Sequence, residues 1–215
     1  GTTPDMTIIK VNVEEQSTGQ ISFGAGFSTT NGFLGDIRLT ERNFLGKGQL
    51  VNLSLTMAAR KSEINLSFTE PYFLDRNIRA GIDLFRDSQD LQESSSLDID
   101  RTGFGLRGGY VITENLRQDW GYNFKIAKIS DVADDASQLI QDQIGTETTS
   151  DISHVVTYDK RDSPLSPTDG FYLNIINNFA GLGGSIRHFR NQFIFGHYYP
   201  LADQWLIIAV GKAGH

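Results

Sequence analysis

The fold of this chain is decided by residues 18–48, which read TGQISFGAGFSTTNGFLGDIRLTERNFLGKG. Apolar residues occupy every second position on both sides of Asn31-Gly32, and polar residues or glycines fill the positions between them. Successive side chains of a β-strand point to opposite faces, so both runs are predicted to be strands with one apolar face. Asn-Gly between two alternating runs predicts a hairpin, and Gly46-Lys47-Gly48 then turns the chain back again.

The same alternation recurs along the rest of the chain. About eleven strands are expected after one leading strand, Met6–Glu15, and no window shows a convincing helical period. The run Ser153–Tyr158 is less regular than the others, and Trp205–Val210 is the most apolar. The strands expected between the first hairpin and the end of the chain contain residues 51–57, 64–68, 80–84, 104–110, 122–126, 153–158, 171–175, 189–195 and 205–210.

Composition excludes several classes of protein. The 215 residues include no cysteine, which excludes disulfides and thiolate metal sites. The net charge of −7 argues against nucleic acid as a partner, because phosphate binding requires a basic face. A mean hydropathy of −0.28 leaves no segment for a transmembrane helix, whereas alternating barrel strands average out in such a measure. The chain does not open on a signal peptide and begins as if cut from something longer.

The expected connections fall into two alternating sets. One set has two long polar members, Asp87–Asp98 and Ser130–Ser150, whereas the other set is short to medium throughout. Long loops at one end and short turns at the other are typical of outer-membrane barrels. Trp and Tyr favour the membrane–water interface, so aromatic residues beside the short set are expected to form a girdle. These residues are Phe44, Tyr72, Phe73, Trp120, Tyr198, Tyr199 and Trp205.

The polar face of the strands carries charges that a dry core would not tolerate. A water-filled lumen accommodates them, with residues such as Ile37 facing lipid. A soluble lipocalin-like barrel would reverse the two faces, and periodicity alone does not separate these cases. Loop asymmetry, the girdle and the strand number favour the membrane. The residues assigned to the lumen are Asp36, Arg38, Asp83, Arg107, Asn123, Lys125 and Arg190.

An odd number of strands is informative, because bacterial single-chain barrels have an even number. The fold expected is therefore an all-β, antiparallel, up-and-down transmembrane β-barrel that is truncated at its C-terminal end.

Several ordered motifs carry a family resemblance. They are ERNFLGKGQ at 41–49, FTEPYFLDR at 68–76, YDKRDSPLSPTDG at 158–170 and AGLGG at 180–184. Together they resemble the BamA family of outer-membrane protein assembly factors over nearly the whole chain. The resemblance implies that residues 1–17 end a periplasmic POTRA domain and that residues 18–215 are the N-terminal portion of the barrel. It also implies a barrel of sixteen strands, of which about eleven are present.

The same resemblance implies a function without ATP, cofactor or covalent chemistry. Proteins of this family insert other β-barrels into the bacterial outer membrane through a seam that opens between the first and last strands. The expected partners are the lipid bilayer, unfolded clients and accessory lipoproteins, and the N-terminal end is expected in the periplasm.

The first strand is the candidate site for pairing with a client strand. Its glycines weaken it, and an open edge presents unpaired backbone groups. The alternative is that these glycines only fit barrel curvature or close side-chain packing. The candidate residues are Gly19, Gln20, Ile21, Ser22, Phe23, Gly24, Ala25, Gly26 and Phe27.

Other candidate sites carry less weight. A structural role is favoured for the motif residues Asp159, Arg161, Asp162, Pro167 and Gly170. No metal site is expected: the acidic loop with Asp131, Asp134 and Asp135 lacks EF-hand spacing, and His154, His188 and His197 lack ligand spacing.

Three other functions remain open as alternatives to assembly. A TamA-like factor or two-partner secretion pore shares the superfamily, a passive porin would need no weak seam, and a soluble ligand-binding barrel would not need detergent. No Gly-x-Ser-x-Gly motif supports hydrolase chemistry, so the chain is not expected to be an enzyme.

Overall fold

A computed structural model describes residues 10, 12, 14, 16–133, 136–202 and 205–215. In this part of the chain, eleven strands form a single sheet in chain order, and all neighbours whose register is known are antiparallel. The expected eleven-stranded, up-and-down all-β fold is confirmed. The strands are β1 (Gly19–Ser28), β2 (Gly32–Phe44), β3 (Gln49–Ala58), β4 (Lys61–Glu70), β5 (Ile78–Asp90), β6 (Asp98–Thr113), β7 (Leu116–Ser130), β8 (Gly145–Asp159), β9 (Gly170–Ala180), β10 (His188–Ala202) and β11 (Trp205–Gly214).

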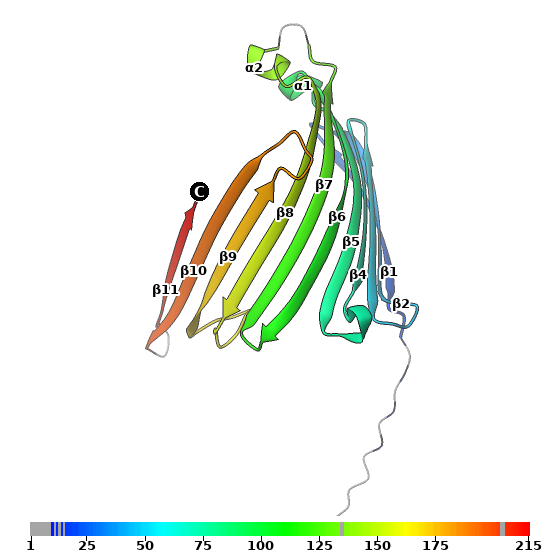
Figure 1. Ribbon diagram of the computed structural model, residues 1–215. Helices are drawn as coiled ribbons and strands as arrows, with labels where there is room; N and C mark the ends of the chain where they lie inside the picture. The colour runs from blue at the N-terminus through cyan, green and yellow to red at the C-terminus, as the bar shows by residue number, and fades with distance from the viewer. Residues whose placement is uncertain (1–9, 11, 13, 15, 134–135, 203–204) are drawn as a thin grey trace, which may run out of the picture.

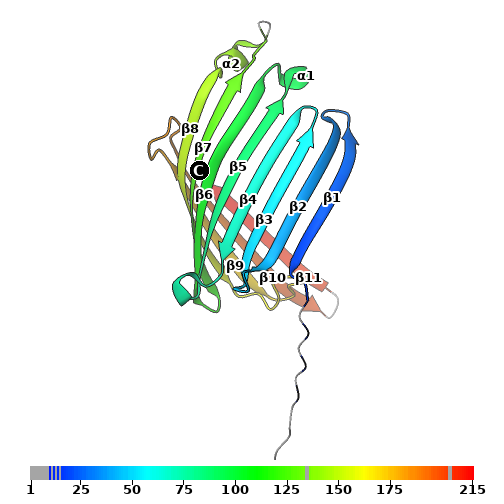
Figure 2. The same cartoon turned by 90° about the vertical axis from the view of Figure 1, so that its right-hand side faces the viewer.

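The sheet is strongly curved. Figures 1 and 2 show it wrapping around a hollow, so that β9–β11 lie behind β1–β5 when the molecule is seen from the side of β1. β1 and β11 are the two edges of the sheet, and each has one neighbour in the described chain. The sheet is therefore a large part of a barrel wall that is not closed between β1 and β11.

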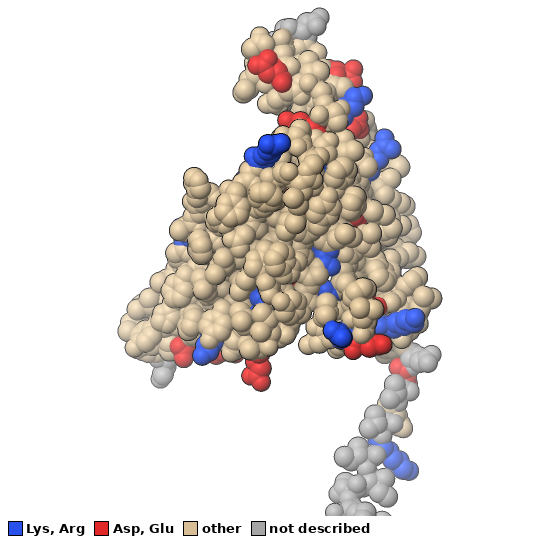
Figure 3. Space-filling view, viewed as in Figure 1, with Lys and Arg blue, Asp and Glu red and all other residues tan. Residues whose placement is uncertain are grey.

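Strand register gathers the apolar side chains on one face. Ile37 lies between Phe23 on β1 and Leu55 on β3, and the same row continues into neighbouring strands. Charged residues gather toward the two ends of the convex face in Figure 3, with few between them. The opposite, concave face carries Asp36, Arg38 and the other polar residues that alternate with this row.

The two ends of the sheet differ, but several strand ends were predicted wrongly. The connections 91–97 and 131–144 stand above the other end-loops in Figure 1. They are shorter than expected because β5 runs to Asp90 and β8 begins at Gly145. Polar residues there still pair across strands, as Asp87 does with Arg101. Where polar side chains occupy both faces of a strand, apolar and polar residues do not alternate, and the pattern no longer predicts the strand.

The long connections contain two single-turn helices, α1 (Gln92–Ser95) and α2 (Gln138–Gln141), which are too short to give a helical period. The two connections also brace each other. The amide of Ala133 donates to the Ser96 carbonyl over 3.0 Å, and the Gln92 side chain donates to the Asp131 carbonyl over 2.7 Å. A third short helix, η1 (Phe73–Asp75), lies in the turn between β4 and β5.

The leading strand Met6–Glu15, and with it the POTRA assignment, lies outside the described residues except for Lys10, Asn12 and Glu14.

No helix in the described ranges has the length and apolarity needed to cross a membrane.

Candidate functional site at the edge strand and the concave face

The nine residues predicted to pair with a client all lie in β1. They pair with β2 from Gly19 opposite Glu41 to Phe27 opposite Phe33. Within the described chain β1 has no neighbour on its other side, so that edge of its backbone is unpaired. Its apolar side chains are well exposed, with Phe23 at 77%. β1 therefore combines an open backbone edge with an apolar face.

Two glycines of β1 differ in the space that a side chain would find at their positions. A Cβ on Gly24 would lie 2.2 Å from Oδ1 of Asp36, so Gly24 makes room for a side chain on the concave face. A Cβ on Gly26 would meet Leu34 at 3.6 Å, which is ordinary contact. The packing explanation thus accounts for Gly24, whereas Gly26 weakens the strand without a packing requirement.

The middle of the concave face is held by a network centred on Arg107. Its guanidinium donates to both oxygens of Asp83, at 2.5 and 3.0 Å, and to the hydroxyls of Ser67 at 2.9 Å and Thr69 at 3.2 Å. One β6 side chain thereby ties β4 and β5 together. Comparable contacts join Arg79 to Asp119, Arg101 to Asp87 and Asn123 to Asp151.

The predicted structural motif forms the turn between β8 and β9. Asp162 accepts hydrogen bonds from the amides of Ser163, Thr168 and Asp169 and from the Thr168 hydroxyl. These bonds, first among them that from the Thr168 hydroxyl, lower the pKa of Asp162 to about 2. Pro167 lies in the same turn.

The two ends of this turn are fixed by a charge pair and a glycine. Arg161 donates to both oxygens of Asp159, at 2.9 and 2.6 Å, and this partner raises the pKa of Arg161. The guanidinium also lies 4.9 Å from the ring centre of Tyr172. Gly170 has φ +97°, and a Cβ there would lie 2.2 Å from the Lys160 carbonyl oxygen. The motif residues are thus brought together, but β2–β7 separate them from β1 in the sheet.

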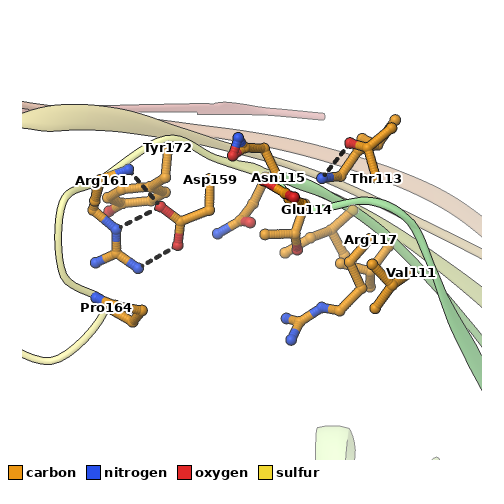
Figure 4. A pocket seen from close by; sticks show the side chains of 14 residues that line it. Val111, Thr113, Glu114, Asn115, Arg117, Asp159, Arg161, Pro164 and Tyr172 are labelled. Atoms are coloured by element: carbon orange, nitrogen blue, oxygen red, sulfur yellow. Dashed lines mark hydrogen bonds and ion pairs between the residues drawn. The ribbon is translucent and has the colours of Figure 1, made fainter. Parts of the chain in front are cut away.

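A cavity of about 590 Å³ lies beside this turn on the concave face. Figure 4 shows Arg161, Asp159 and Tyr172 along one side of it and Glu114, Asn115 and Arg117 along the other. The buried Oδ1 of Asn174 makes no hydrogen bond within the described chain. The wall of this cavity is polar, and of its charged residues Arg161 and Asp159 pair with each other.

No group of three His, Asp or Glu residues in the described ranges is arranged to hold a metal ion. Asp134 and Asp135 of the predicted acidic loop lie outside those ranges. His154 instead belongs to a row of polar side chains on the apolar face. The Tyr110 hydroxyl donates to Gln118 over 2.5 Å, the Gln118 amide contacts His154 Nε2 at 2.6 Å, and Asn177 contacts Nδ1 at 3.4 Å.

Sequence reasoning missed this outward row and the central role of Arg107. Alternation assigns a residue to a face but does not say which residue lies opposite it on the next strand. His154 meets Asn177 only through the β8–β9 register, 23 positions apart. No local motif signals such a contact.

Comparison with known proteins places this geometry in a family. A profile of the Omp85 superfamily domain matches residues 43–215. The outer membrane protein assembly factor BamA of Neorickettsia risticii (strain Illinois) is 26% identical over 209 residues, covering 97% of this chain and 28% of the relative. The protein of the same name from Nitratidesulfovibrio vulgaris is 30% identical over 213 residues, covering 98% of this chain and 26% of the relative. The chain thus spans about a quarter of the length of these curated relatives.

The fold also matches a solved structure. The crystal structure of BamA from Haemophilus ducreyi lacking POTRA domains 1–3 superimposes with a TM-score of 0.71 and 23% identity. The match covers 94% of this chain and 42% of that one. The antiparallel barrel wall is therefore shared with that protein. With a superfamily profile that matches most of its length, this chain belongs to the Omp85 superfamily.

Proposed function

We propose that this chain is part of an outer-membrane barrel that assembles other β-barrel proteins, and that β1 is the strand on which a client strand pairs. The relatives named above are outer membrane protein assembly factors. The observation that carries the proposal is how weakly β1 is held: its ten residues are joined to β2 by the backbone ladder, without an ion pair to a described residue, and Gly26 has no packing requirement.

The proposed mechanism is physical. In lipid, an unpaired backbone group costs several kcal/mol, so an incoming client strand gains by pairing with the exposed edge. The exposed apolar side chains Ile21, Phe23 and Phe27 would extend the same apolar face onto the client strand. No cofactor, ATP or covalent step enters this mechanism.

The proposal places the apolar convex face against the lipid of the bacterial outer membrane and the concave face around a wet lumen. The short-turn end, where β1 begins, would face the periplasm, with residues 1–17 as the end of a POTRA domain. Unfolded outer-membrane proteins are the proposed clients, and accessory lipoproteins the proposed partners of the intact protein.

A disulfide that locks the seam tests the mechanism in the intact, full-length protein. One cysteine replaces Ser22 in β1 and the other is placed opposite it on the closing strand. We expect the oxidised protein to stop inserting clients into vesicles and the reduced protein to recover. The sequence contains no native cysteine, so a cysteine at position 22 is the only one in this chain.

A second disulfide serves as the matched control. Ser22 and Arg38 are directly paired within the β1–β2 hairpin, so cysteines at these positions cross-link β1 without closing the seam. This variant should retain insertion when oxidised. Normal insertion by the protein locked at the seam would overturn the pairing mechanism.

A further inference from the structure

Two turns at the short-turn end share an unusual feature. Each contains the dipeptide Phe-Leu, at Phe44-Leu45 after β2 and at Phe73-Leu74 after β4. Both leucines have left-handed backbones, with φ 55° for Leu45 and 57° for Leu74. Residues with a Cβ adopt this conformation rarely, and glycine usually takes its place.

The strained conformation leaves both leucine side chains outside the protein. Leu45 and Leu74 are each 74% exposed, and the phenylalanines before them are 41% and 45% exposed. Figure 1 shows both turns at the lower end of the sheet, which is the end at which β1 begins. Backbone strain that exposes apolar side chains in two turns indicates a contact beyond the described chain.

A cavity of about 470 Å³ lies between the two turns. Gln49 and Glu70, which line it, are joined by a 2.6 Å hydrogen bond and continue the apolar face that carries Val51 and Phe68. The cavity therefore lies at the rim of the apolar face. In the proposed membrane position, this rim is at the level of the lipid headgroups.

The cavity presents both signs of charge. Lys47 and Asp75 line it, and neither makes an ion pair within the described ranges. Glu70 accepts hydrogen bonds from Gln49 and from the Tyr72 amide. The cavity thus holds one cation, Lys47, and two carboxylates, Glu70 and Asp75, and Lys47 also acts on Glu70 electrostatically. This balance matches a zwitterionic headgroup better than a purely anionic one: its phosphate would meet Lys47, and its ammonium would meet Asp75 and the ring of Tyr72.

We infer that the cavity between the two Phe-Leu turns binds the zwitterionic headgroup of a phospholipid, and that Leu45 and Leu74 insert beside its acyl chains. The inference rests on the proposed function for the placement of this rim in a bilayer. The site lies at the ends of β3 and β4, so β2 separates it from the strand that is proposed to receive the client.

Lipid retention by the full-length protein in maltoside micelles tests this site. Native mass spectrometry would follow titrations with phosphatidylethanolamine and, separately, phosphatidylglycerol, which has no ammonium group. We expect the wild-type protein to bind phosphatidylethanolamine about tenfold more tightly. Lys47→Gln should weaken that binding about tenfold, and Asp75→Asn should remove the preference between the two lipids.

Lys160→Gln is the matched control, because it removes the same charge from another turn at the same end, and it should bind as the wild type does. Leu45→Gly and Leu74→Gly keep a backbone that glycine accepts, so they test the site even where a charge variant folds poorly. They should also reduce retention of phosphatidylethanolamine.

The outcomes separate this inference from the proposed function. Equal retention of phosphatidylethanolamine by wild type, Lys47→Gln and the leucine variants would overturn the site, whether or not clients are assembled. Equal affinity of the wild type for the two lipids would overturn the zwitterionic match. A seam lock that leaves assembly unimpaired would overturn the pairing mechanism while the lipid site remained.

Discussion

The edge hairpin β1–β2 and the middle strands β5–β8 follow the same alternation, yet different forces hold them. In the middle, Arg107 and its neighbours tie strands together through charged hydrogen bonds on the concave face. Among the described residues of β1 and β2, by contrast, no ion pair occurs. β1 has ten residues, whereas β6–β8 have fifteen or sixteen. β1 is thus held to β2 by its backbone and one apolar face, while the middle strands are cross-braced; this is what the proposed exchange of partners at β1 requires.

The largest expected difference between the two regions concerns their glycines. Gly170→Ala should lower the free energy of unfolding by about 3–4 kcal/mol, because the left-handed backbone is strained and the new Cβ meets the Lys160 carbonyl. Gly26→Ala in β1 should be neutral or stabilise slightly, since its Cβ has room. Urea titrations of folding in lipid measure both. A similar loss for the two variants would mean that β1 is as tightly constrained as the turn.

The second test separates the two faces next to the edge. Ile37→Arg should destabilise the barrel by about 2–4 kcal/mol if it lies near the bilayer midplane. Thr56→Arg places the same charge on the concave face, opposite Asp36, and should cost little. The same titration in lipid compares them. A larger loss for Thr56→Arg than for Ile37→Arg would mean that the lipid and lumen faces are reversed.

The third test compares two arginines of the concave face. Arg107→Met should cost about 1–2 kcal/mol, because Asp83 loses its partner in a partly solvated site. Arg38→Met in β2 should change stability by less than about 0.5 kcal/mol, since Arg38 makes no ion pair with a described residue. Equal effects in the folding titration would contradict the view that the bracing is confined to the middle.

The smallest effect is a local one in the β8–β9 turn. The folded pKa of Asp162, about 2, lies below its unfolded value of about 3.9. Its carboxylate therefore stabilises the turn above pH 4 and loses this contribution as the pH falls through 2. Hydrogen exchange of the Thr168 and Asp169 amides should quicken over that range, beyond the intrinsic change. In Asp162→Asn this extra acid-dependent step should be absent, and its persistence would assign it to another group.

Alternation in the sequence was sufficient for the number of strands and for the two faces, because both depend only on the period of two. Strand ends were harder, since polar residues near Asp90 and Gly145 pair beyond the apolar band. The edge position of β1 also followed from sequence order. Partners such as Arg107 with Ser67, and the left-handed Leu45 and Leu74, depend on register and turn geometry, for which the sequence contains no local signal.

The outward row of Tyr110, Gln118, His154 and Asn177 has a consequence for strand register. A shift of one residue between strands would turn apolar side chains onto the concave, polar face, so the apolar pattern forbids it. A shift of two residues keeps every side chain on its own face, and the pattern alone would tolerate it. Such a shift would separate the Gln118 amide from His154 Nε2 and leave polar groups unpaired on the apolar face. The hydrogen bonds of this row thus favour one strand register among those that the apolar pattern allows.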